Sequence, residues 1–341
     1  MREKKTTGSG CRLGLRCALL LPPAVLITLY FLLRQTPGAA DKAASGFSAP
    51  VRRFLGSLCS HVDFSIMEVF YAAVILWLLV YLGFGIAAVV RSEKKWKTAW
   101  CRLLTIVLVF SCIWAAYCWL WGIDYYGESF AEKNGLTVTA VKTEDLETLT
   151  QFFAEQASAL SSQVSRDADG HFQTDTDSLF SRSVSLYAAS VDNTFPCLAG
   201  ESFRPKAMIF SWLMSDMGFT GVYFPFTGES NINVDEPACM LPFTVAHELA
   251  HQRGVTAEQE ANFIGIYACV SSGDTEFAYS GYLSGLVYLS NALYQADSDA
   301  YSDVMSSLSD EVKTDLADNT AYWAAQESAV TTASEKTYDV Y

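Results

Sequence analysis

Residues 66–90 read IMEVFYAAVILWLLVYLGFGIAAVV, a long apolar run with one charged side chain, Glu68. A helix needs about 20 apolar residues to cross the hydrocarbon core of a bilayer. Two further runs reach this length, at about 13–33 and 103–121. The sequence therefore predicts three transmembrane helices. The first run could also be a cleaved secretory signal, because small residues follow it at 38–40.

Positive charge in the short flanking segments predicts how these helices are oriented. Lys and Arg gather before the first run and between the second and third, and such clusters favour the cytoplasmic side. The C-terminal region should then lie outside a bacterial-type plasma membrane, with the protein crossing it several times. The clustered residues are Arg2, Lys4, Lys5, Arg12 and Arg16, and then Arg91, Lys94, Lys95, Lys97 and Arg102.

The charge of the 341-residue chain is unevenly distributed. The net charge is −14, but residues 1–122 carry +9 and residues 123–341 carry −23. An acidic surface argues against nucleic acid as a partner, because phosphates need a basic footprint. We expect a membrane anchor over 1–122, an extracytoplasmic domain over 123–295 and an acidic helical tail over 296–341.

The nine cysteines contain no C-x-x-C pair, which argues against a thiolate zinc ribbon or a redox pair. Cys197, Cys239 and Cys269 lie in the soluble part. The sequence leaves open whether two of them form a disulfide or all three are free thiols.

The soluble part reads as an α+β domain that is mainly helical. Pro225 suggests that the first of two short strands lies at the edge of a sheet. The spacing of apolar residues and the turn residues predict the elements as follows: a helix over 143–163, loop with short elements over 165–202, a helix or a strand and turn over 205–217, strands over 221–226 and 230–234, and mostly helix over 241–295.

The chemistry is concentrated at His-Glu-Leu-Ala-His, residues 247–251. On a helix, His247 and His251 lie on one face, so both imidazoles can bind one metal ion. Zinc accepts such ligands and keeps an open position when the protein supplies only three. Glu248 could then take a proton from the activated water. The alternative is that the two histidines are held by ordinary neighbours.

A second helix should follow closely. Gly254 suits a left-handed helix end, and Thr256 to Gln259 matches a capping box, so we expect a helix from about Ala257. Glu258 in its first turn is the best third metal ligand, and Asn262 could orient a ligand histidine from one turn further on. Glu260 lies about 200° around the helix from Glu258 and is the alternative ligand.

The predicted edge strand offers two further hypotheses. An extended substrate peptide could pair with it. Tyr223 within it is a candidate stabiliser of a tetrahedral oxyanion, although packing is the simpler role.

The stretch from Pro205 to Cys269 resembles one bacterial membrane family, that of the domain of unknown function 3810. The similar segments are PKAMIFSWLMSDMGFTGVYFPFTGESNINVD, LPFTVAHELAHQRG and EQEANFIGIYAC, with WGIDYYGESFAEKNGL upstream. The resemblance implies a membrane zinc peptidase of unknown substrate.

The HExxH and E-x-x-A-N segments also resemble gluzincin metallopeptidases. That resemblance implies zinc ligands at His247, His251 and Glu258, with Glu248 as catalytic base. Only six residues separate His251 from Glu258, fewer than in many gluzincins, so Glu260 stays open.

The expected function is therefore a membrane-anchored zinc metalloendopeptidase that hydrolyses peptides or proteins, with a neighbouring membrane or envelope protein as one candidate substrate. The alternative is a non-catalytic metal-binding sensor or structural anchor. An intact Glu248 argues against that alternative, since structural zinc sites favour four protein ligands and cysteine.

Overall fold

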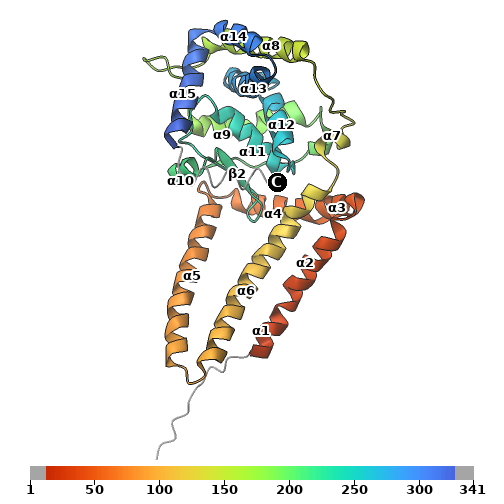
Figure 1. The fold of residues 1–341 in the computed structure, drawn as a ribbon, viewed down its shortest axis with the longest axis vertical. Helices are drawn as coiled ribbons and strands as arrows, with labels where there is room; N and C mark the ends of the chain where they lie inside the picture. The colour runs from red at the N-terminus through yellow and green to blue at the C-terminus, as the bar shows by residue number, and fades with distance from the viewer. Residues whose placement is uncertain (1–12, 327–341) are drawn as a thin grey trace, which may run out of the picture. The chain divides into compact units, whose positions relative to one another are not determined.

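The apolar runs form helices long enough to cross a membrane, as the sequence predicts (Figure 1). The first spans Leu13–Leu33 and is interrupted at Leu20, just before two prolines whose missing amide hydrogens interrupt helical bonding. It comprises α1 (Leu13–Leu19) and α2 (Leu21–Leu33), and the others are α5 (Ile66–Arg91) and α6 (Lys95–Leu120). The third helix begins eight residues before the predicted Leu103, because its polar first turns are helical as well.

The computed structural model describes residues 13–326. The chain separates into two compact units, Met1–Ser48 with Glu68–Gly127, and Ala49–Met67 with Glu128–Tyr341. The second unit thus includes a segment from between the first two apolar helices, which the sequence alone does not assign to it.

In the first unit, α1 and α2 pack against α6. The Trp119 indole donates a hydrogen bond to the Leu26 carbonyl oxygen at 3.0 Å, and the Arg16 guanidinium donates one to the Thr105 hydroxyl at 2.8 Å. Short helices complete this unit: α3 (Pro37–Ala43), η1 (Ala44–Ser48) and η2 (Gly122–Tyr126).

The second unit is mainly helical and has two apolar cores. One prediction was wrong: within the expected loop 165–202 the chain forms α9, because Leu179, Phe180 and Tyr187 bury one face of a serine-rich helix. The helices are α4 (Ala49–Cys59), α7 (Phe130–Lys133), α8 (Thr143–Ser161), α9 (Thr176–Val191), η3 (Pro196–Leu198), α10 (Ser211–Asp216), α11 (Leu241–Gln252), α12 (Glu258–Val270), α13 (Thr275–Ala296), α14 (Ser298–Ser306) and α15 (Asp310–Gln326).

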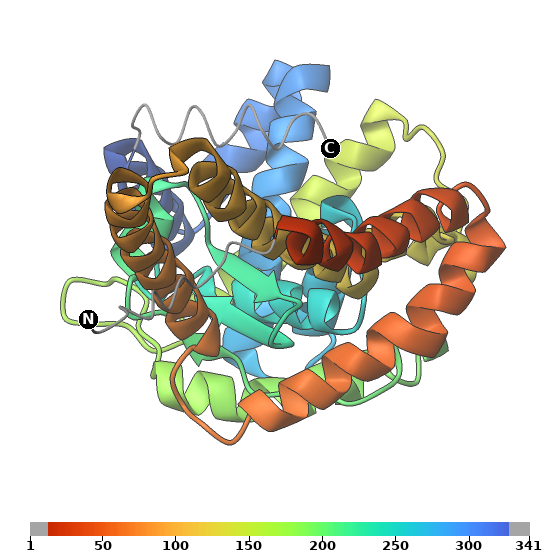
Figure 2. The same ribbon diagram turned by 90° about the horizontal axis from the view of Figure 1, so that it is seen from below.

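A small sheet lies beside α11, visible as short arrows in Figure 2. Its strands are β1 (Lys206–Ala207), β2 (Gly221–Phe224) and β3 (Glu229–Ile232), in the order β1-β3-β2. β2 pairs antiparallel with β3 and lies at the edge, as Pro225 predicts. Gly228, in the left-handed region at φ 69°, makes the turn between them.

The second unit holds the start of α5 through a buried ion pair between Lys206 and Glu229. The Glu229 carboxylate accepts hydrogen bonds from the backbone amides of Ile66 and Met67, each at 3.2 Å. The Lys206 ammonium donates to the carbonyl oxygens of Cys59 and Phe64 at 2.8 and 3.0 Å. Every charge here has partners, as burial requires.

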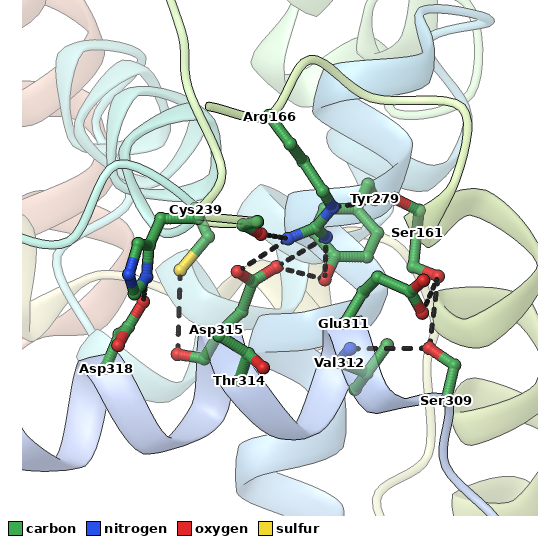
Figure 3. Close-up of polar contacts among 12 residues, drawn as sticks. Ser161, Arg166, Cys239, Tyr279, Ser309, Glu311, Val312, Thr314, Asp315 and Asp318 are labelled. Atoms are coloured by element: carbon green, nitrogen blue, oxygen red, sulfur yellow. Dashed lines mark hydrogen bonds and ion pairs between the residues drawn. The ribbon is translucent and has the colours of Figure 1, made fainter. Parts of the chain in front are cut away.

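The C-terminal helix α15 is fixed by a second buried cluster (Figure 3). The Asp315 carboxylate, 1% exposed, receives a bidentate pair of hydrogen bonds from Arg166 at 3.0 and 2.8 Å and one from the Tyr279 hydroxyl. The Cys239 thiol contacts the Asp315 carbonyl oxygen at 3.9 Å. The predicted polar tail is therefore helical through Gln326, and part of it belongs to the core.

Candidate metal centre

Helix α11 carries the His-Glu-Leu-Ala-His motif and is buried along most of its length. Pro242 suits its first turn, where an amide hydrogen has no intrahelical partner. Near its other end, the Ser230 hydroxyl of β3 donates to the Glu248 carbonyl oxygen at 2.9 Å. The Gln252 amide group donates to that same hydroxyl at 3.1 Å. The motif is thus tied to the sheet.

The turn after α11 brings α12 back beside it. Gly254 has φ 93°, which confirms the predicted left-handed helix end. The predicted capping box at Thr256 was wrong, because α12 begins at Glu258 with Ala257 as its N-cap and no side-chain cap. Close packing of the two helices depends on Gly265, where a Cβ would lie 3.1 Å from the His247 backbone nitrogen.

The structure brings His247, His251 and Glu258 together. The two Nε2 atoms lie 2.9 Å apart, and Oε2 of Glu258 lies 3.3 Å from that of His247 and 3.6 Å from that of His251. Ligands about 2.0–2.1 Å from a tetrahedral ion are separated by about 3.3 Å. The three atoms therefore have the spacing of one face of a tetrahedral metal site.

Glu248 also lies close to this group. Ligand atoms of His247, Glu248 and His251 fall within 4.8 Å of one another, so these three residues form a possible metal cluster. Two carboxylates could thus supply the third ligand. Glu258 is the better candidate, because a single oxygen of its carboxylate approaches both imidazole nitrogens.

Glu258 is more exposed than the histidines, with 54% of its side chain accessible. Its partial burial would raise the pKa of the carboxyl group, but hydrogen bonds and charge from His247 and His251 outweigh burial and lower that pKa. Glu258 is therefore a carboxylate at neutral pH, the form that binds a metal ion.

The alternative ligand Glu260 faces another part of the chain. Its two carboxylate oxygens accept hydrogen bonds from the backbone amides of Phe130 and Ala131, each at 3.0 Å. It thus satisfies the free amides at the start of α7. The carboxylates of Glu258 and Glu260 therefore face different parts of the chain, as their spacing on one helix predicts.

A backbone carbonyl group orients one of the histidines. Nδ1 of His251 lies 2.7 Å from the Val255 carbonyl oxygen, which leaves Nε2 directed at the candidate site. Nδ1 of His247 is buried, without a hydrogen-bond partner among the described residues. Asn262 is half-buried on α12, and the described hydrogen bonds include none from its amide to either histidine. Its orienting role remains a prediction.

Glu248 is 3% exposed and lies against the edge strand β2. A Cβ at Gly221 would be 2.6 Å from Oε1 of Glu248, so only glycine leaves room for this carboxyl group. Burial raises the pKa of Glu248, and the neighbouring His251 and His247 partly oppose that change. A buried carboxyl group beside two imidazoles is suited to accept and release a proton.

Two tyrosines lie near the site. Tyr223 is buried in β2 and, two residues after Gly221, shares the strand face that meets Glu248. Tyr288 of α13 was not singled out from the sequence. Burial raises its pKa, and so does the charge of Glu258. The Tyr288 ring also lies 6.4 Å from that of Phe243 on α11. No motif in the sequence marks this contact, because it joins separate helices.

Two further residues that the sequence did not single out lie near the two ends of α11. Arg253 donates hydrogen bonds to the Ser202 hydroxyl at 2.5 Å and the Leu198 carbonyl oxygen at 2.7 Å, so it anchors the end of α11. Glu236 is fully buried in the segment before α11, where desolvation raises its pKa well above the ordinary value. Burial therefore favours the protonated, neutral form of this carboxyl group.

Comparison with known proteins gives the family. A family model described as a protein of unknown function, DUF3810, matches residues 44–341. The chain belongs to the DUF3810 family. The match extends over both apolar helices after residue 44 and over the whole candidate centre, so the expected resemblance to this family of unknown function is confirmed. No curated protein and no solved structure matches this DUF3810 chain.

Three cysteines of the second unit of this DUF3810 chain form no disulfide bond. Cys197, Cys239 and Cys269 are all free thiols, the second of the two alternatives that the sequence leaves open. Burial raises the pKa of the Cys239 and Cys269 thiols, so both stay protonated and serve as small apolar residues. Cys197 is exposed.

Proposed function

We propose that the protein is a membrane-anchored zinc metallopeptidase. His247, His251 and Glu258 would hold the ion, and Glu248 would be the catalytic base. The observation that carries the proposal is the spacing of the two Nε2 atoms and Oε2, at 2.9, 3.3 and 3.6 Å. Two nitrogens and one carboxylate oxygen form a donor set that zinc accepts, and it leaves one position open.

Each protein group then has a defined part in hydrolysis. A bound zinc ion would supply Lewis acidity, lowering the pKa of a coordinated water from about 15.7 to about 7. Glu248 would take the proton of the attacking water and pass it to the leaving amine. Either Tyr223 or Tyr288 could donate a hydrogen bond to the developing oxyanion.

The edge strand gives a place for an extended substrate. In the described sheet, β2 is an edge strand, and we propose that an extended substrate peptide lies along it. Gly221 at the start of β2 lies against Glu248, and the strand ends near the turn at Gly228. A Cβ at Gly228 would lie 2.5 Å from the Arg52 carbonyl oxygen, so this turn packs on α4. A paired peptide would thus run from the base toward α4.

The charge distribution supports one orientation in the membrane. The cationic clusters over 2–16 and 91–102, at the ends of the apolar helices, favour the cytoplasm. We infer that the second unit is extracytoplasmic, where its substrates would be peptides or proteins of the membrane or envelope.

Metal content of the full-length protein tests the site. We expect one zinc ion per purified chain, lost in Glu258→Gln and retained in Glu260→Gln. The matched pair separates the two carboxylates, which stand two residues apart on one helix. A well-folded native chain without metal would refute the proposal, and loss of metal only in Glu260→Gln would move the third ligand.

An assay of peptide hydrolysis then distinguishes a peptidase from a non-catalytic metal-binding protein. A peptide library should be cleaved by the native chain and not by Glu248→Gln, which keeps every metal ligand. Zinc binding without any cleavage would favour the non-catalytic metal-binding sensor or anchor instead.

A further inference from the structure

Four large apolar side chains are exposed within five residues around the start of α10. Ile209 is 71% exposed and Trp212 56%, with Phe210 and Leu213 also exposed. A globular protein seldom leaves so dense an apolar group in water without a function. The indole of Trp212 adds a polar N–H, the combination found where protein meets the bilayer surface.

Helix α4 has a second group of this kind. Arg52 and Gly56 are buried one turn apart, and Gly56 faces Phe203 so closely that a Cβ there would lie 2.6 Å from its ring. Phe54 and Leu58 are also one turn apart but about 200° around the helix, and they are 63% and 55% exposed. One side of α4 therefore packs against the rest of the second unit, and its other, apolar side is exposed.

Both groups are linked to the beginning of α5. Lys206 binds the carbonyl oxygens of Cys59 and Phe64 on either side of the loop from α4 to α5. Ile209 follows Lys206 by three residues. The partner of Lys206, Glu229, binds the amide of Ile66, the first residue of the apolar helix α5. Both exposed apolar groups are thus connected, through Lys206 and Glu229, to the segment that leads into α5.

Charge favours lipid as the occupant of this surface. Residues 123–341 carry a net charge of −23, so most of the second unit would be repelled by anionic headgroups. The segment 49–67 is different, because its two arginines, Arg52 and Arg53, outnumber its single carboxylate, Asp63. Arg53 is exposed beside Phe54, where an arginine can reach headgroup phosphates while its neighbour enters the acyl region.

We propose that these side chains form a lipid-binding face of the second unit that rests in the bilayer surface. We call it the interfacial face: Phe54, Leu58, Phe64, Ile209, Phe210, Trp212 and Leu213. Its occupant is phospholipid, because Phe64 lies two residues before α5, an apolar helix of membrane-spanning length. The proposal does not depend on zinc or on hydrolysis.

Photolabelling of the full chain tests the face. The native protein is placed in vesicles of phosphatidylethanolamine and phosphatidylglycerol that contain a phospholipid with a diazirine in its acyl chain. Adducts are located by mass spectrometry, and a parallel sample receives a water-soluble diazirine. We expect acyl-chain adducts on 54–64 and 209–213. Tyr294 of α13 is the matched control, since it is as exposed as Trp212 at 56% and should react only with the soluble reagent.

Each result decides the question. Labelling of the face by the soluble reagent alone, as at Tyr294, would overturn the proposal. Protection from both reagents would also overturn it, and would indicate a protein partner or a second copy. Trp212→Asp should reduce the acyl-chain adducts on 209–213 severalfold, whereas Tyr294→Asp should leave them unchanged. Because labelling needs no catalysis, an inactive protein can still give the expected result.

Discussion

Replacing Gly221 by alanine tests whether the edge strand positions Glu248. The added Cβ would lie 2.6 Å from Oε1, 2.7 Å from Cγ and 2.9 Å from Cδ of that carboxyl group, where ordinary contacts begin at 3.4 Å. Glu248 must therefore move by about 0.8 Å, or β2 must move away. The backbone at Gly221 does not have positive φ, so alanine adds bulk without conformational strain.

A displacement of this size should affect the chemistry more than the fold. A shift of about 1 Å in a catalytic group can cost about 100-fold in rate, equivalent to about 2.7 kcal/mol at the transition state. We expect Gly221→Ala to lower kcat by about that factor. The three atoms nearest to the new methyl group all belong to Glu248, which is not one of the proposed zinc ligands, so zinc content should be unchanged.

The assay compares kcat and metal content of the full-length variants on any peptide that the native chain cleaves. Gly200→Ala is the matched control, because its Cβ would meet only the Arg253 guanidinium, at an ordinary 3.4 Å. If Glu248→Gln abolishes cleavage while Gly221→Ala retains native kcat, the inferred packing of Glu248 on β2 is refuted.

Four other predictions follow from single side chains. Glu260→Gln should keep its metal but unfold more easily, by about 1–3 kcal/mol, because a charged acceptor for two amides of α7 is weakened; urea unfolding measures this. Asp315→Ala should cost about 3–5 kcal/mol, since it leaves Arg166 buried without its partner; thermal unfolding would show it. Glu236→Gln should raise thermal stability more at pH 8 than at pH 5. Because the pKa of Glu236 is higher in the folded state than in the unfolded state, native stability falls as pH rises above the ordinary pKa of about 4.5, and glutamine removes this dependence. A membrane-impermeant thiol reagent should label Cys197 on intact cells if the second unit is extracytoplasmic.

Two of these predictions have a control variant, and a third has a result that would contradict it. Equal effects of Glu236→Gln at both pH values would contradict the raised pKa of this buried carboxyl group. Exposed Asp299→Ala should cost far less than Asp315→Ala. Cys197→Ser should abolish the cell-surface label, and label that appears only after lysis would reverse the proposed orientation.

The sequence predicts well what short-range spacing decides. Apolar runs of spanning length gave the helices α2, α5 and α6, and the i, i+4 spacing of His247 and His251 placed both imidazoles together. Helix geometry also separated Glu258 from Glu260 correctly, since their side chains face different parts of the chain. These features depend on residues within one or two helical turns.

What the sequence did not show depends on contacts between distant segments. Helix α9 was not predicted because its many serines suggest a loop, and its apolar residues are recognised as one helix face only from their packing in the core. The membership of 49–67 in the second unit depends on Lys206 and Glu229, which look like ordinary surface charges in the sequence. Likewise, nothing local marks Gly221 as the residue that makes room for Glu248.

The hydrogen bonds between Glu229 and the start of α5 have a consequence for biosynthesis. Glu229 is 163 residues downstream of Ile66. At about 5–20 residues per second, a ribosome needs roughly 8–30 s to travel that distance. During this interval α5 can already be inserting, while the segment before it still lacks the sheet on which it will rest. The second unit therefore cannot complete its fold in the order in which the chain is made, and residues 49–67 lack these contacts until the strands have been synthesised.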